Sequence, residues 1–236
     1  MKIAVCISGQ PRAYDKGYEY LKKNLLDHYD VDIFIHTWKN KVYGTKKVID
    51  LYKPVDYLVE DFNIFDRAAL NKKYTNTPNP EVFPPSNAVF AYYSIFQSCL
   101  LKTKNETKTQ AYDWVIKTRF DYALNGQIPF STIDKTKIYI PNCRMVITRD
   151  FGNDQFAFGS TFVMNKYMST YWHLEDYYNA GYQMNGEEML KATLRNNNLI
   201  GDSLVYVNMN NPFPPGKYNG TPHSLIRDDM ELWKGI

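Results

Sequence analysis

The chain has 236 residues, of which 44% are hydrophobic and 22% are charged, and its formal net charge is +3. This length suits one domain, or one domain with a small subdomain, and the composition is that of an ordinary globular protein. The Lys and Arg residues are scattered without forming a basic stripe, which argues against a nucleic-acid-binding protein but fits an anionic small molecule as ligand.

Three cysteines, Cys6, Cys99 and Cys143, lie far apart and lack the spacing of metal ligands. Cys6 and Cys99 stand in apolar runs, which predicts small core residues, and so sparse and odd a set indicates a reducing compartment. The N-terminal apolar run is too short for a signal peptide, and no run reaches the length of a membrane span. We therefore expect a cytoplasmic protein, in the cytosol of a bacterium or of the host of a virus.

The first half of the chain alternates strands with helices. Short apolar, β-branched runs predict strands at 3–7, 31–38 and 55–61. Apolar residues at helical spacing predict helices at 15–29 and 46–52. The Pro- and Asn-rich stretch 75–85 predicts a loop, after which Ser86 is expected to cap a long, buried helix. This alternation indicates βαβ units and a mostly parallel sheet.

The second half mixes strands and helices less regularly. Strands are predicted from Trp114, at 137–142, at 153–165 with a kink at Gly159, and at 203–208. Helices are predicted at 166–178 and 186–196, and the Pro- and Gly-rich tail is expected to be irregular.

Charged residues follow the strand that begins at Trp114. Lys117, Arg119 and Asp121 are spaced by two, so strand alternation places them on one face. Ligands of open α/β sheets bind beyond the carboxyl ends of the strands. The three residues therefore indicate either contacts to a ligand, which we favour for Asp121, or a cluster of salt bridges at the end of the sheet.

Five segments in this order resemble the nucleotide-sugar-dependent glycosyltransferases of the GT-A fold. They are "KIAVCISGQPR", "VDIFIHTW", "AVFAYYSIFQSC", "WVIKTRFDYAL", and "NDQFAFGSTFVMN" followed by "GEEML". The resemblance is to a group of small capsular, lipopolysaccharide-type and large-DNA-virus enzymes. It implies an α/β, GT-A-like (Rossmann-like) single domain over 1–236, whose mixed, mainly parallel central sheet is flanked by helices. Residues 1–124 would form the nucleotide-binding half, and 125–236 the acceptor-side half with its irregular tail.

The resemblance implies that the loop after the first strand holds the nucleotide. Gly9 would let the backbone approach a ligand, and Arg12 would pair with a diphosphate. His36 or Trp38 would stack on or hydrogen-bond a base, although each residue type is also common as a packed structural residue. The nucleotide-binding residues implied are Ser8, Gly9, Gln10, Arg12, His36, Trp38, Lys117, Arg119 and Asp121.

Enzymes of this fold usually carry an Asp-x-Asp motif whose carboxylates hold Mn²⁺ or Mg²⁺. Here the place reads Arg119-Phe120-Asp121, so the first acid is replaced by an arginine. Two interpretations stay open. Either Asp121 and His223 from the tail hold a divalent metal, or Arg119 and Lys117 neutralise the diphosphate without one.

The resemblance places the acceptor near Asp154, Glu187 and Glu188. Asp154 would contact sugar hydroxyls, and one of the three carboxylates would act as general base. Adjacent residues of a helix diverge by about 100°, so at most one of Glu187 and Glu188 faces the ligand. Acids in a first helical turn are also favoured by the helix dipole alone.

The function implied is a hexosyltransferase-type glycosyltransferase of glycan biosynthesis, which moves a sugar from a nucleotide-diphosphate donor to a glycan hydroxyl. We expect no nucleic-acid partner and no transmembrane segment. The tail, 212–229, would close over the donor and exclude water. Two alternatives stay open: a catalytically degenerate glycan-binding or scaffold protein, because the first Asp is missing, and a sugar nucleotidyltransferase, which the single glycine of "SGQPR" disfavours.

Overall fold

A computed structural model describes residues 1–39, 42–77, 79–141 and 154–207. Its strands form one seven-stranded sheet in the order β3-β2-β1-β4-β6-β5-β7. The pairs β1–β2, β1–β4, β2–β3 and β5–β7 are parallel, and β6 runs antiparallel to both of its neighbours. This arrangement confirms the α/β class and the mixed, mainly parallel central sheet.

The bounds of the elements follow the predicted order. The strands are β1 (Lys2–Gly9), β2 (Asp30–Trp38), β3 (Asp56–Glu60), β4 (Trp114–Thr118), β5 (Ile138–Pro141), β6 (Ala157–Gly159) and β7 (Leu204–Val207). The α-helices are α1 (Tyr14–Leu21), α2 (Thr45–Tyr52), α3 (Arg67–Lys73), α4 (Pro85–Glu106), α6 (Thr161–Met168), α7 (Leu174–Asn179) and α8 (Gly186–Asn196). Shorter helical turns are η1 (Lys22–Leu26), η2 (Phe62–Ile64), η3 (Thr170–His173) and η4 (Gly201–Ser203).

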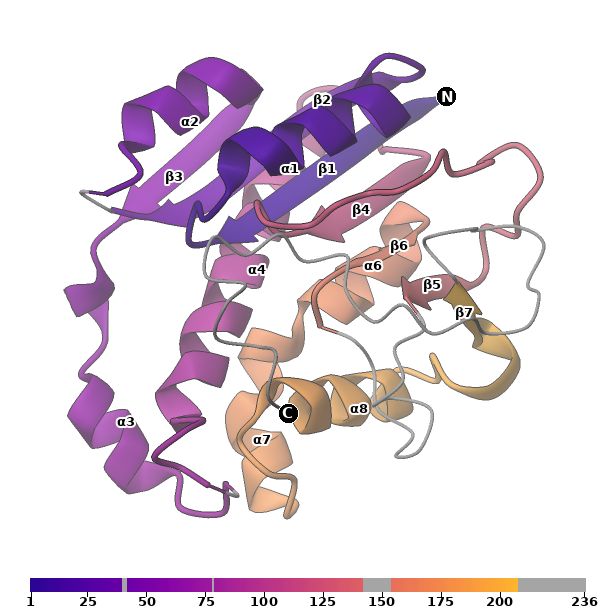
Figure 1. The fold of residues 1–236 in the computed structure, drawn as a ribbon. Helices are drawn as coiled ribbons and strands as arrows, with labels where there is room; N and C mark the ends of the chain where they lie inside the picture. Colours follow the sequence, from indigo (N-terminus) through magenta and orange to yellow (C-terminus); the bar gives the residue numbers. More distant parts are fainter. Residues whose placement is uncertain (40–41, 78, 142–153, 208–236) are drawn as a thin grey trace.

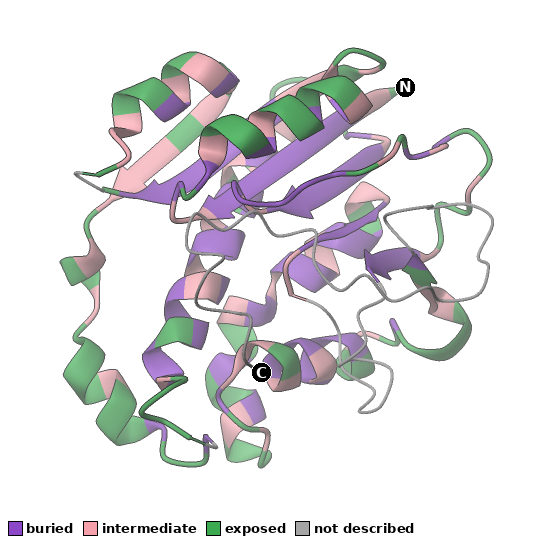
Figure 2. Cartoon of the chain, viewed as in Figure 1, coloured by how far each residue is buried: buried purple, intermediate pink, exposed green. Residues whose placement is uncertain are grey.

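Helices cover both faces of the sheet. In Figure 1, α1 and α2 lie above it, while α4 and α6 lie below. Alternate residues of β1 separate into two hydrophobic clusters: Ile3 and Val5 pack with α1 and α2, whereas Ala4 and Cys6 pack with α4 and α6. Figure 2 shows the result, with central strands buried and the outer sides of α1 and α2 exposed. Cys6 belongs to the core, as does Cys99 on α4, which confirms their predicted role.

The long helix α4 is well buried, as its nearly all-round apolar pattern predicted. Its predicted cap is wrong, however. The helix begins at Pro85, and Pro84 occupies the capping position without a side-chain hydrogen bond. Ser86 lies inside the first turn, and its backbone N–H donates to Oδ1 of Asn71 over 3.0 Å. Proline in a first turn suits a helix because its missing N–H would be unpaired there anyway.

Segment 153–165 differs most from its prediction. Among its described residues, 154–165, the strand part is β6 alone, and α6 begins two residues after Gly159. A side chain at Gly159 would lie 3.1 Å from the carbonyl oxygen of Lys137 and 3.2 Å from Val163, so the chain turns there in close contact with its neighbours. Val163 and Tyr167 are buried on one side of α6, at helical spacing. From the sequence, the apolar residues of this segment were interpreted as an imperfect strand alternation. Likewise α3 was not predicted, and helix 15–29 ends early, in the π turn η1.

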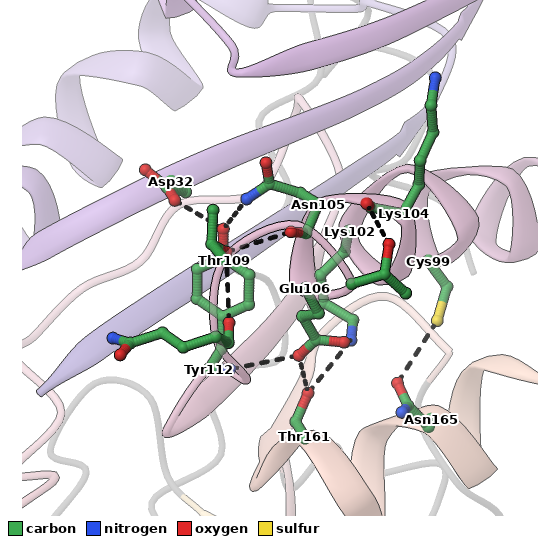
Figure 3. A network of polar contacts seen from close by, with 12 residues as sticks. Asp32, Cys99, Lys102, Lys104, Asn105, Glu106, Thr109, Tyr112, Thr161 and Asn165 are labelled. Carbon is green, nitrogen blue, oxygen red and sulfur yellow. Dashed lines mark hydrogen bonds and ion pairs between the residues drawn. The ribbon is translucent and has the colours of Figure 1, made fainter.

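A buried polar network ties the C-terminal end of α4 to the sheet (Figure 3). Lys102 is fully buried, and its Nζ lies 2.5 Å from Oε2 of Glu106. Glu106 also accepts hydrogen bonds from the Thr161 hydroxyl at 2.6 Å and from the backbone N–H of Tyr112 at 3.2 Å. The Tyr112 hydroxyl in turn donates to Asp32 at the start of β2 over 2.5 Å. This network fixes α4 against both α6 and β2.

Candidate functional site

Two side chains from other elements fix the backbone of the turn after β1. The backbone N–H of Gly9 donates to Oγ of Ser94 on α4 over 2.8 Å, and its carbonyl accepts from Oγ1 of Thr37 on β2 over 2.9 Å. Gly9 has a φ of +103°, and a side chain there would meet no heavy atom of the described residues within 4 Å. The backbone is thus fixed in a conformation that favours glycine and has open space beside it.

His36 and Trp38 lie behind this turn, in the core. His36 is fully buried, with Nε2 2.9 Å from Oε2 of Glu60 and Nδ1 2.7 Å from Oγ of Ser94. Burial lowers its pKa even though Glu60 opposes this effect. A neutral ring fits the contacts if Nε2 donates to Glu60 and Nδ1 accepts from the Ser94 hydroxyl. Trp38 is 2% exposed and stacks on Phe62. Contact with a base would require either side chain to leave this packing.

The other predicted residues of the turn differ in exposure. Ser8 is buried, whereas Arg12 is exposed and its Nε donates to Oε1 of Gln10 over 3.3 Å. The backbone N–H of Arg12 also donates to the carbonyl of Gln10. Arg12 is therefore the cation of this turn that has access to solvent.

β4 ends beside the turn, because Ile7 of β1 pairs with Thr118 of β4. Lys117 is 1% exposed, and its Nζ donates to the backbone carbonyl of Asp154. Burial lowers the pKa of Lys117 to about 8, and the charge of Arg119 adds to this effect while Asp154 opposes it. Burying an ammonium group at this edge of the sheet costs free energy unless hydrogen bonds or an opposite charge compensate it.

Arg119 and Asp121 form a two-point ion pair. Nε of Arg119 donates to Oδ1 of Asp121 over 2.8 Å, and Nη2 donates to Oδ2 over 2.7 Å. The side chain of Asp121 is 2% exposed, and that of Arg119 is 32% exposed. Burial alone would lower the pKa of Arg119, but the hydrogen bonds to Asp121 outweigh it and raise the pKa.

Asp154 lies against the start of α8. A side chain at Gly186, the first residue of α8, would lie 2.6 Å from Oδ2 of Asp154, so the carboxylate occupies the space a Cβ would take. A negative charge there interacts favourably with the helix dipole. The hydroxyl of Tyr92, on α4, donates to the carbonyl of Gly186 and so fixes the same helix start.

The two adjacent glutamates of α8 have different surroundings. Glu187 is exposed to solvent, yet its pKa is raised, first by the partial desolvation of its carboxyl group and second by the nearby charge of Asp154. Glu188 is 17% exposed, and its Oε1 lies 3.5 Å from Nζ of Lys191. Glu187 is therefore the glutamate whose carboxyl group interacts with the charge of Asp154.

Sequence reasoning missed Ser94, Thr37, Tyr92 and Tyr167. Burial and the charge of Asp154 raise the pKa of both tyrosines, which places their hydroxyls near this carboxylate. Ser94 and Tyr92 belong to an apolar helix whose pattern indicated only a core element. No local signal distinguishes them there, because their partners lie 85 and 94 positions away in the sequence.

The residues that the structure describes do not by themselves form a site for a divalent metal. Each carboxylate oxygen of Asp121 already accepts an N–H of Arg119, which places a positive charge beside the expected ligand. Among these described residues, no three His, Cys, Asp or Glu side chains lie close enough together to hold a metal ion. His223, the second expected ligand, and the tail 212–229 lie outside the described residues.

The structure thus brings Lys117, Arg119, Asp121 and Asp154 together where β4 leaves the sheet, and the charge of Glu187 interacts with that of Asp154. The family model for a domain of unknown function, DUF7796, matches residues 1–222. The chain belongs to the DUF7796 family. None of the curated proteins matches it.

Within the described part of the chain, no helix has both the length and the apolar character needed to cross a membrane.

Two solved structures show a weak likeness to this DUF7796 member. An active-site mutant of LgtC is 10% identical, with 88% of this chain and 73% of that chain covered and a TM-score of 0.48. A protein of Desulfovibrio desulfuricans G20, provisionally assigned as a nucleotide-diphospho-sugar transferase, is 8% identical, with 88% and 79% covered and a TM-score of 0.42. At these scores neither likeness carries a conclusion about the chemistry of this chain.

Proposed function

We propose that this protein is a GT-A-like glycosyltransferase that moves a sugar from a nucleotide-diphosphate sugar to a glycan hydroxyl. The observation that carries the proposal is the group formed by Lys117, Arg119, Asp154 and Glu187 at the carboxyl edge of the parallel strands, beside the open turn at Gly9. Ligands of such sheets bind at this edge. Two cations suit a diphosphate, and two carboxylates suit sugar hydroxyls.

The nucleotide side of the site would be residues 1–124. The backbone at Gly9 would approach the nucleotide closely, and Arg12 and Arg119 would bind the diphosphate from two sides. Ser8, Gln10, His36 and Trp38 would then keep the turn in place. The burial of His36 and Trp38 supports this positioning role over direct contact with a base.

The acceptor side would be residues 125–236, with Asp154 and Glu187 at its centre. Glu187 would take the proton of the acceptor hydroxyl while that oxygen bonds to the anomeric carbon. The bond between this carbon and the diphosphate oxygen breaks, and the leaving diphosphate keeps the electron pair. Arg119 and Lys117 would stabilise the negative charge that develops there. A raised pKa makes Glu187 a stronger base than an ordinary carboxylate.

The proposal predicts that the purified protein releases a nucleoside diphosphate from one of a panel of UDP, GDP, CDP and dTDP sugars when a glycan acceptor is present. Glu187→Gln should lower kcat by roughly 10²- to 10⁴-fold, the usual contribution of a general base. Glu19→Gln, which changes an exposed glutamate on the outer side of α1, is the matched control and should leave kcat unchanged.

Two results would contradict the enzyme as proposed. Binding of a nucleoside diphosphate without sugar release or transfer would favour the glycan-binding or scaffold alternative. Formation of a nucleotide sugar from a nucleoside triphosphate and a sugar phosphate would favour a nucleotidyltransferase.

A further inference from the structure

The ion pair between Arg119 and Asp121 leaves part of the guanidinium available to a ligand while it occupies both carboxylate oxygens of Asp121. A guanidinium has five N–H donors, and Asp121 accepts from two of them, one on Nε and one on Nη2. The two-point contact fixes the plane of the guanidinium, as matched planar groups do. Three N–H donors remain that Asp121 does not accept, and about a third of the Arg119 side chain stays exposed.

Asp121 is poorly placed to act as a metal ligand in this arrangement. Its side chain is 2% exposed, and each of its oxygens is engaged by Arg119. A divalent cation would have to displace the guanidinium or lie beside it against charge repulsion. Lys117 places a second positive charge close to the pair, because its Nζ interacts with the charges of Arg119 and Asp121. Asp121 and Asp154 oppose these two cations, so it is the engagement of both Asp121 oxygens by the guanidinium, and not the net charge of the cluster, that disfavours a metal cation there.

The pair lies at the carboxyl edge of the parallel strands, where ligands of such sheets bind. Thr118 pairs with Ile7, so Arg119 leaves β4 beside the end of β1 and its open turn at Gly9. On the other side, the backbone carbonyl of Phe120 lies directly against α1, where a side chain at Gly17 would come within 1.8 Å of it. This contact fixes the backbone between Arg119 and Asp121.

We propose that Asp121 is a positioning residue that orients Arg119, and that the site binds a nucleoside diphosphate through Arg119, with Lys117 behind it, and without a divalent cation. This inference rests on the proposed function and concerns the same site. Pre-organisation by Asp121 reduces the conformational entropy that Arg119 would otherwise lose on binding.

The test is titration calorimetry of UDP, GDP, CDP and dTDP against the full chain, once with Mn²⁺ and once with EDTA. We expect one nucleotide to bind with the same Kd in both buffers. Arg119→Ala should weaken that binding by roughly tenfold or more in both, since a charge-assisted hydrogen bond is lost. Melting temperatures of the unliganded variants identify any variant that fails to fold. Arg119→Lys is included as the variant that conserves the charge.

Asp121→Asn separates the two roles of Asp121. A positioning residue predicts weaker binding in EDTA and in Mn²⁺ alike, because Arg119 loses its charged partner under both conditions. A metal ligand predicts weaker binding only in Mn²⁺. Wild-type binding that requires Mn²⁺, or an Asp121→Asn defect confined to Mn²⁺, would overturn the inference and leave the proposed function standing. If no nucleotide binds in either buffer, the proposed function fails and this inference fails with it.

Discussion

The hydroxyl oxygen of Ser94 on α4 accepts the backbone N–H of Gly9 over 2.8 Å, although 85 positions separate the two residues in the sequence. The same hydroxyl lies 2.7 Å from Nδ1 of the buried His36. One small side chain therefore connects the turn after β1 to a polar chain that continues to Glu60. The shape of this turn depends on a helix that is remote from it in sequence.

Ser94→Ala should weaken nucleotide binding. The substitution leaves the N–H of Gly9 and Nδ1 of His36 without this partner, at a cost of about 1 to 3 kcal/mol, and it frees the turn to move. Ser98→Ala is the matched control, because Ser98 is equally buried one helical turn further on but donates only to the carbonyl of Ile95 in its own helix. We expect the nucleotide Kd, measured by calorimetry, to rise in Ser94→Ala and to stay unchanged in Ser98→Ala. Equal effects would contradict the role of Ser94.

Gly186→Ala should lower turnover without lowering stability to match. Alanine is the better helix former by about 1 kcal/mol, so helix propensity alone predicts a higher melting temperature. The new methyl group would, however, lie 2.6 Å from Oδ2 of Asp154 and must displace this carboxylate. We expect kcat to fall, and the Asp154→Ala, Gly186→Ala double variant to lose no more kcat than Asp154→Ala alone. Additive losses would show that Gly186 acts independently of Asp154.

The pH profile of kcat/KM should report Glu187. A general base must be ionised, so activity falls as the pH drops through its pKa. Desolvation and the charge of Asp154 raise this pKa, so the acid limb should lie above the ordinary range of a glutamate. Removing the neighbouring charge with Asp154→Asn should move the limb to lower pH. An acid limb at the ordinary carboxyl pKa that Asp154→Asn leaves in place would contradict Glu187 as the base.

Glu106 should make the stability of the fold depend on pH. Burial alone would raise its pKa, but the hydrogen bonds from Lys102 and Thr161 outweigh this and lower it. A carboxyl group with a lowered folded-state pKa contributes stability above its unfolded pKa, and this contribution is lost as the pH falls through the folded pKa. Glu106→Gln leaves Lys102 as a buried charge, and breaking a buried pair costs about 3 to 5 kcal/mol.

Denaturant titrations at neutral and acid pH test this expectation. The difference in unfolding free energy between wild type and Glu106→Gln should be large at neutral pH and should shrink under acid conditions. Glu175→Gln is the control, because its ion pair with Lys73 is about half exposed and such pairs contribute about 1 kcal/mol or less. Equal losses in both variants would contradict the special role of the buried network.

The sequence predicted those parts of the fold that depend on local patterns. The strands β1, β2 and β4 are short apolar runs, and α8 begins and ends at the residues predicted for it, Gly186 and Asn196. The turn of chain at Gly159 and the start of α6 were missed, because close contacts with Lys137 and Val163 decide them rather than a local pattern. The prediction that Ser86 caps α4 was wrong because the helix already starts at the proline before it.

For the candidate site, the sequence identified charged residues but not how they pair. Lys117, Arg119 and Asp121 were expected on one face, yet the two-point contact between Arg119 and Asp121 depends on backbone geometry after β4 ends. His36 and Trp38 were expected near a ligand because the residue types suit one. Their burial follows from packing against Glu60, Ser94 and Phe62, which no spacing in the sequence reveals.

Thermal stability with added nucleotides tests the central claim, that this edge of the sheet binds a nucleotide-diphosphate donor, most directly. A ligand that binds only the folded protein must raise its melting temperature. We predict that one of UDP, GDP, CDP and dTDP raises the Tm of the wild type and has little effect on Arg119→Ala. No shift with any of the four nucleotides, or an equal shift in both proteins, would contradict the account.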